Sequence, residues 1–92
     1  MQIILTDHAL SRLEERIVSR EEIMAVLEHG EVIEWYPDDK PFPSRLISGK
    51  VGGRHLHVVA ATDAESQLEY IVTVYLPNPA KWSADFRRRI KK

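Results

Sequence analysis

The 92-residue chain is 43% hydrophobic and 29% charged, which is the composition of one folded domain and not of a disordered segment. It contains no cysteine, so disulfides and thiolate metal sites are excluded. No apolar run is long enough to span a membrane, and the chain shows no signal-peptide pattern. We therefore expect a single cytoplasmic domain over residues 1–92, with no membrane association.

The net charge of −1 conceals an asymmetry between the two halves of the chain. Residues 1–43 carry ten acidic and four basic side chains, whereas residues 44–92 carry four acidic and nine basic ones. Such a distribution predicts an anionic partner for the C-terminal half. The alternative is a solvated basic tail that only keeps the domain soluble.

Two helices are predicted near the N-terminus, after a short strand at Gln2–Leu5. The first covers about Asp7–Ile17, where apolar residues recur at the spacing of one buried helix face. Ser19 and Glu22 have the spacing of a capping box, so the second helix begins there, and Gly30 ends it.

The remaining pattern is mostly that of strands. Runs rich in β-branched and aromatic residues predict strands at Glu31–Tyr36, Ser44–Val51, Arg54–Thr62 and Leu68–Leu76. Ser83 can cap a short basic helix over Ala84–Ile90. The predicted fold class is α+β: two N-terminal helices packed on an antiparallel sheet of about four strands, followed by a short C-terminal basic helix.

The adjacent glycines Gly52 and Gly53 predict a two-residue hairpin turn, which fixes the register of the strands on either side. Because side chains alternate across a sheet, one face of this hairpin should meet the core and the other should not. The core face gathers Ile47, Leu56, Val58 and Ala60. On the other face His57 is expected beside Ser48 and beside Tyr75 or Thr73. The even positions of Leu68–Leu76 are expected to continue the core face.

This second face carries residue types that suit metal-free cleavage of RNA. The reaction needs a base, an acid and cations around the phosphate, and histidine titrates near neutral pH. We expect His57 to act as base or acid, with Tyr75 or His55 as its complement. The candidate RNA-binding residues are those that can contact phosphate: His8, Arg12, Arg16, Arg45, Lys50, Arg87 and Arg88. His55 and His57 have no obvious third metal ligand, so we expect neither metal nor cofactor.

Each of these residues also has a structural explanation. A strand histidine beside Ser and Tyr is often only hydrogen-bonded. His8, Arg12 and Arg16 recur every four residues on one helix, next to its apolar stripe. Such a basic stripe commonly covers the core with its aliphatic stems and pairs with nearby carboxylates.

Several short motifs in order resemble a bacterial domain-of-unknown-function family, number 4258. The resemblance covers nearly the whole chain, and it is carried by His8-Ala9 with Arg12 and Arg16, Ser19-x-x-Glu22-Ile23, Tyr36-Pro37-Asp38-Asp39-Lys40-Pro41, Leu56-His57-Val58-Val59, Thr73-Val74-Tyr75, and Pro79 with Lys81-Trp82. Of the candidate residues, His8, Arg12, Arg16 and His57 are motif matches.

That family is similar to the RelE-like ribonuclease toxins, in which helices pack on an antiparallel sheet whose concave face holds RNA. The resemblance implies an mRNA-directed endoribonuclease of a toxin–antitoxin pair, with mRNA as substrate and a small antitoxin protein as partner. The antitoxin of such proteins commonly has a zinc-finger segment.

Two other readings of the sequence predict no catalysis. One is a binding module for RNA or protein that uses the same face and the basic tail. The other is a small dimeric interaction protein that makes its contact through the Pro37–Pro43 loop and a sheet edge.

Overall fold

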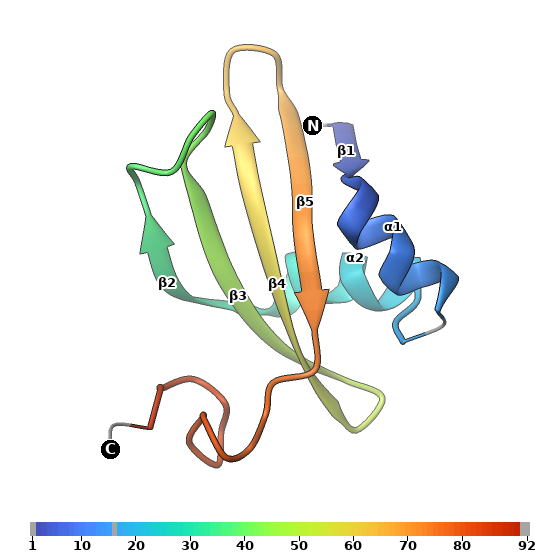
Figure 1. Cartoon of the computed structure of the whole chain (residues 1–92), viewed down its shortest axis with the longest axis vertical. Helices are drawn as coiled ribbons and strands as arrows, with labels where there is room; N and C mark the ends of the chain where they lie inside the picture. The colour runs from blue at the N-terminus through green and yellow to red at the C-terminus, as the bar shows by residue number, and fades with distance from the viewer. Residues whose placement is uncertain (1, 16, 91–92) are drawn as a thin grey trace.

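The computed structural model describes residues 2–15 and 17–90 (Figure 1). Within them, two helices cover one face of a five-stranded mixed sheet. The elements in chain order are β1 (Gln2–Leu5), α1 (Asp7–Glu14), α2 (Arg20–His29), β2 (Glu31–Tyr36), β3 (Ser44–Val51), β4 (Arg54–Asp63) and β5 (Leu68–Tyr75). The strands lie in the order β1-β5-β4-β3-β2, so β1 and β2 form the two edges.

Side-chain caps fix where the two helices begin. The Thr6 hydroxyl accepts a hydrogen bond from the Ala9 amide and lies 2.9 Å from the Val72 carbonyl, which ties the start of α1 to β5. The predicted capping box is present, because Ser19 and Glu22 each accept from the other's backbone amide. The predicted end of α1 was too late: α1 ends at Glu14, not at Ile17.

The hairpin register predicted from Gly52 and Gly53 is confirmed. Both glycines have positive φ, at 57° and 81°, which is the conformation that a tight two-residue turn requires. The turn pairs Val51 with Arg54 and Ser48 with His57, and the ladder continues to Ser44 and Ala61.

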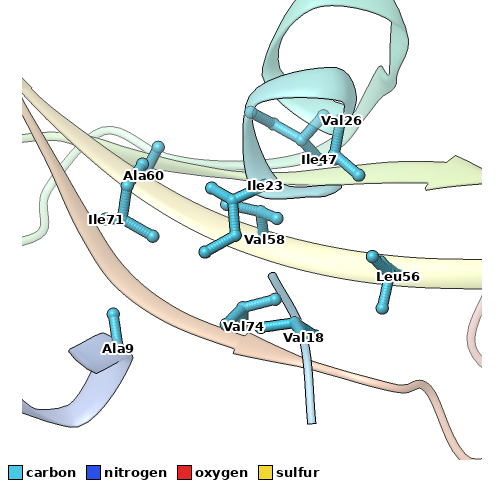
Figure 2. Close-up of a cluster of buried hydrophobic side chains, with 10 residues drawn as sticks. All are labelled: Ala9, Val18, Ile23, Val26, Ile47, Leu56, Val58, Ala60, Ile71 and Val74. Atoms are coloured by element: carbon cyan, nitrogen blue, oxygen red, sulfur yellow. The ribbon is translucent and has the colours of Figure 1, made fainter. Parts of the chain in front are cut away.

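The core lies between this sheet and the two helices (Figure 2). The predicted core residues Ile47, Leu56, Val58 and Ala60 are all buried. Burying such apolar surface is the main stabilising contribution to a domain of this size. From the helices and β5 come Ala9, Val18, Ile23, Val26, Ile71 and Val74.

The predicted fold class was wrong in two respects. The first concerns the sheet, which is not purely antiparallel: β1 pairs in parallel with β5, from Gln2 beside Leu68 to Leu5 beside Ile71. A parallel edge strand can form because α1 and α2 lie between β1 and the rest of the sheet in the sequence, so β1 can reach the far edge. A four-residue strand carries no pattern that reveals its direction.

The second error is the C-terminal helix. Residues 84–90 form turns and not a helix, and Trp82 pairs with Arg89 in an isolated bridge. The side chains of Ser83 and Asp85 accept from the amides of Arg88 and Arg87, so they take the place of helical carbonyls. Phe86 has φ of 58°, which a right-handed helix does not allow.

A bulge also overturns the expected alternation in β5. The register of β4 and β5 shifts between Val59 and Ala60. Val74 therefore faces the core as expected, but Ile71 replaces Val72 there, and Val72 is exposed.

Candidate functional site

The sheet face turned away from the helices, which we call the far face, carries the candidate site. Strand pairing places Glu34 of β2 beside Leu46, and Ser48 of β3 beside His57 of β4. His57 in turn pairs with Tyr75 of β5, so the predicted neighbours of His57 are confirmed. The C-terminal segment, residues 77–90, folds over this end of the far face (Figure 1).

His57 is the centre of the site, and its side chain is fully buried. It does not point into the core between helices and sheet; the C-terminal segment buries it from the other side. Its ring makes edge contacts with Trp82 and Tyr75, with centroids 4.5 and 5.3 Å apart. Its Nε2 lies 2.8 Å from the carbonyl oxygen of Phe86, which the Ser48 hydroxyl also contacts at 3.3 Å.

These contacts define the protonation state of His57. A carbonyl only accepts, so Nε2 must carry the hydrogen that is donated to Phe86. Burial lowers the pKa of His57 below its ordinary value, so the ring is neutral at pH 7. Its Nδ1 therefore has a lone pair, and it accepts from the Tyr75 hydroxyl at 3.2 Å. Burial raises the pKa of Tyr75, which keeps that hydroxyl protonated.

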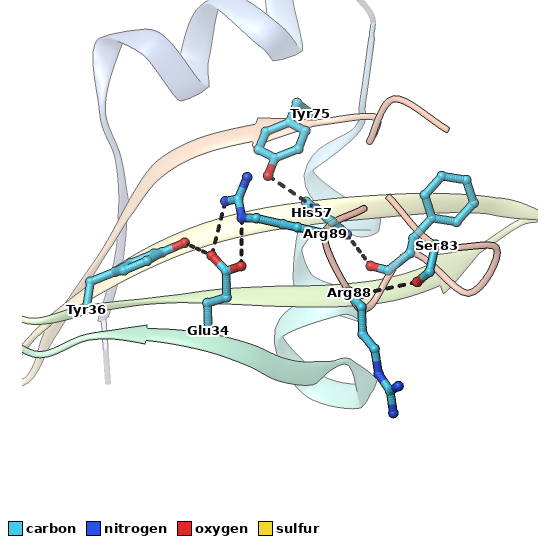
Figure 3. Close-up of polar contacts among 8 residues, drawn as sticks. Glu34, Tyr36, His57, Tyr75, Ser83, Arg88 and Arg89 are labelled. Atoms are coloured by element: carbon cyan, nitrogen blue, oxygen red, sulfur yellow. Dashed lines mark hydrogen bonds and ion pairs between the residues drawn. The ribbon is translucent and has the colours of Figure 1, made fainter. Parts of the chain in front are cut away.

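A second polar cluster, formed by Glu34, Tyr36 and Arg89, adjoins His57 (Figure 3). The Arg89 guanidinium donates two hydrogen bonds to the Glu34 carboxylate, at 2.8 and 3.1 Å, and Tyr36 donates to the same carboxylate. The bonds from Arg89 lower the pKa of Glu34, and burial raises the pKa of Tyr36. Arg89 also lies over the Trp82 ring, 4.6 Å from its centroid. With its side chain 58% exposed, Arg89 presents a fixed cation to solvent.

Four of the predicted residues lie on the far face or in the C-terminal segment that covers it. The ring of His55 packs on Phe86, with centroids 4.5 Å apart. Lys50 pairs with His55 across the hairpin and is exposed. Arg87 forms an ion pair with Glu31 at 3.2 Å, and Arg88 is exposed in the same segment.

Other predicted phosphate contacts lie elsewhere. Arg45 is on the helix-bearing face, two residues from the core residue Ile47, and is paired with Glu69. His8 and Arg12 belong to α1, whose Ala9 is buried in the core on that same face. They are therefore on the opposite side of the sheet from His57. Arg16, the third member of their stripe, lies outside the described residues.

The sequence reasoning missed the partners that complete the site: Glu34, Tyr36, Trp82, Phe86 and Arg89. Glu34 and Tyr36 are two residues apart on a strand, so their shared face could have been predicted from alternation. Which face they share depends on the register between β2 and β3, and that pairing contains a bulge after Val32. The position of Arg89 depends on an irregular segment that was expected to be helical.

Comparison with known families gives one match. A family model described as "Domain of unknown function (DUF4258)" matches residues 5–76. The chain belongs to this family. The matched DUF4258 region includes Glu34, His57 and Tyr75, and it ends just before the C-terminal segment that covers them. Comparisons with curated proteins and with solved structures gave no significant match.

Two further properties bear on the possible partners of this DUF4258 domain. None of the helices described in residues 2–15 and 17–90 is long and apolar enough to cross a membrane. Within the same residues, no group of three His, Asp or Glu side chains is placed to hold a metal ion.

Proposed function

We propose that this DUF4258 domain is a toxin-like, metal-independent mRNA endoribonuclease, related to the RelE-like toxins and paired with a small antitoxin protein. One observation carries the proposal: the lone pair of a neutral, buried histidine is directed at the hydroxyl of a partly exposed tyrosine. His57 is thereby linked to the surface through Tyr75. An exposed arginine held by Glu34 lies beside this pair.

The proposed reaction begins with proton transfer through Tyr75. The 2′-hydroxyl of the RNA gives its proton to the Tyr75 oxygen while Tyr75 passes its own proton to Nδ1 of His57. The 2′-oxygen then bonds to phosphorus and the bond from phosphorus to the 5′-oxygen breaks. The leaving oxygen takes a proton from Tyr36, which is protonated at neutral pH. After the products leave, His57 releases its proton through Tyr75 to solvent and Tyr36 takes one up from solvent, so both groups return to their starting states. The products are a 2′,3′-cyclic phosphate and a 5′-hydroxyl.

Two charged groups assist this reaction without exchanging protons. Arg89 neutralises the charge that builds up on the phosphoryl oxygens. Glu34 and Trp82 already hold its guanidinium in place, so Arg89 does not have to be ordered when the substrate binds. The Phe86 carbonyl stabilises the imidazolium that forms when His57 accepts the proton. Glu34 and Phe86 are therefore positioning groups in this scheme.

The proposal is tested by induced expression in bacteria and by analysis of the RNA ends. The wild-type chain should arrest growth and leave 2′,3′-cyclic phosphate ends. Tyr75→Phe keeps the ring but removes the relay, so cleavage should fall by about a hundredfold or more. Ser66→Ala is the control, because it removes an exposed hydroxyl from the β4–β5 turn, outside the His57 cluster. A wild-type chain that is harmless under strong induction, or a Tyr75→Phe variant as toxic as wild type, would contradict the proposal.

A binding module without catalysis is the second candidate, and the burial of His57 favours it. Both ring nitrogens have partners within the chain, which is what a structural histidine requires. This candidate expects RNA binding that weakens with salt, with no cleavage products at any protein concentration.

A further inference from the structure

A second feature of the far face lies outside the His57 cluster. A cavity of about 460 Å³ lies between the loop at residues 37–43 and strand β5. Its apolar lining includes Val59, Ala61 and Val72. Val59 follows His57 by two residues on β4, so both side chains point to the far face, about 7 Å apart along the strand. The cavity therefore adjoins the His57 site.

Two aromatic rings give this cavity a flat wall. Phe42 from the loop and Tyr70 from β5 stack with their planes 6° apart and their centroids separated by 5.7 Å. Both line the cavity. A flat ligand laid against this pair would extend the stack, and base–aromatic stacking contributes about 1–3 kcal/mol per base. The wall therefore favours a planar ring over a branched aliphatic group.

The rim supplies a carboxylate in a fixed position. Asp39 accepts a hydrogen bond of 2.5 Å from the hydroxyl of Ser44, which is only 4% exposed. This bond orients the carboxylate, and its oxygens can still accept further hydrogen bonds. Both residues line the cavity, together with the exposed Lys40. The cavity thus combines a flat apolar wall with an acceptor pair and a nearby cation.

We propose that this cavity binds a guanine base of the RNA substrate. Guanine presents two adjacent donors, N1–H and the N2 amino group, which match the two oxygens of a carboxylate. Adenine and cytosine each offer a single amino group beside a ring acceptor, which a carboxylate repels. Lys40 provides positive charge for the attached phosphate. The inference takes its ligand from the proposed ribonuclease function, and it assigns to that activity a preference for cleavage beside guanine.

Direct binding of nucleosides tests the inference without any cleavage. In calorimetry or ligand-observed NMR, guanosine should bind at least about tenfold more tightly than adenosine or cytidine. Asp39→Asn removes one acceptor and its charge with little change of shape, and should abolish the preference for guanosine. Tyr70→Ala should weaken binding of every nucleoside, whereas Tyr70→Phe keeps the stacking ring and should not.

The possible results separate this inference from the proposed function. Guanosine binding that depends on Asp39, and that persists in Tyr75→Phe, supports the base site even if the chain cleaves no RNA. No detectable binding of guanosine, equal binding of the three nucleosides, or an Asp39→Asn variant that keeps the preference would overturn it. Growth arrest without guanosine binding would leave the ribonuclease proposal standing and remove only the guanine site.

Discussion

At the scale of single residues, His57 combines full burial with a complete set of hydrogen bonds. In the resting fold the ring is neutral, because protonation would place a positive charge in a site where His57 has no exposed surface. The same contacts that would prepare it as a proton acceptor therefore also make it part of the fold. Stability and chemistry at His57 need separate measurements.

We predict that His57 makes the fold sensitive to mild acid. Its pKa is lowered from 6.5 by burial, so the unfolded chain binds a proton on His57 more readily than the folded chain does. The contribution of His57 to the free energy of unfolding should therefore be constant above pH 6.5. It should fall as the pH decreases below 6.5, by at most about 1.4 kcal/mol per pH unit.

Denaturant titrations between pH 5 and 8 check this prediction. His57→Gln is the comparison, because an amide can donate to Phe86 and accept from Tyr75 but does not titrate. The unfolding free energy of His57→Gln should be lower than that of wild type, and it should change less with pH between 5 and 8. The same slope in both proteins would assign the acid sensitivity to other groups.

At the scale of elements, Gly30 shows how closely α2 packs against the sheet. A Cβ at this position would lie 2.5 Å from the Val26 carbonyl oxygen and 2.9 Å from that of Ser48. Backbone atoms cannot move aside as a side chain can, so Gly30→Ala should destabilise the fold by about 1–3 kcal/mol. Thermal or denaturant unfolding measures this loss.

Gly49→Ala is the graded control for Gly30. Its Cβ would come no closer than 3.1 Å, and the nearest atom belongs to the side chain of Val26. We expect a clearly smaller loss of stability than for Gly30→Ala. Equal losses at the two positions would show that close backbone approach is not what requires glycine after α2.

The elements also show what could be predicted from the sequence. Local signals were sufficient where one interaction decides the geometry: the Ser19–Glu22 capping box and the Gly52–Gly53 turn each specify their element. Local signals were insufficient where contacts with residues distant in the sequence decide the geometry. The even positions of β5 have the cleaner apolar pattern, which predicted Val72 in the core. Because of the bulge opposite Val59, Ile71 is buried there and Val72 is exposed.

For the candidate site too, the sequence predicted what local geometry decides and missed what distant parts of the chain decide. Turn geometry and alternation together placed His57 beside Ser48, and matching core faces placed it beside Tyr75 or Thr73, of which Tyr75 is its partner in the sheet. They could not show that Trp82 and Phe86 would bury it, because the C-terminal segment is held by side-chain contacts and has no periodic pattern. Its arginines suggested a helix that binds phosphate, whereas Arg87 and Arg89 pair with glutamates of β2.

At the scale of the whole molecule, the charge asymmetry of the sequence has an internal explanation. Among the described residues, three ion pairs join an acidic residue of the first half to an arginine of the second: Glu22–Arg54, Glu31–Arg87 and Glu34–Arg89. Two of these hold the C-terminal segment against β2. The basic end of the chain is thus partly neutralised by the acidic half, and Arg89 is placed beside His57 as a result.

We predict that the pairing of Glu34 with Arg89 helps to dock the C-terminal segment. Glu34→Arg and Arg89→Glu each place like charges together, so each should loosen the segment and speed tryptic cleavage at Arg87 and Arg88. The double variant restores an opposite-charge pair and should recover part of the protection. The expected coupling is about 0.5–1 kcal/mol, because both side chains are partly exposed to solvent.

Cleavage rates under native conditions measure this coupling, since trypsin attacks the segment only when it opens. Raising the salt concentration should reduce the difference between the single variants and wild type, as screening weakens exposed pairs. The matched control is the reversal of Glu31, whose ion pair with Arg87 is more exposed and should contribute less. The double variant could instead be cleaved at the rate expected from adding the effects of the two single variants. The Glu34–Arg89 pair would then not help to hold the segment, which would be held by Trp82 and Phe86 alone. The charge asymmetry would then need an external partner.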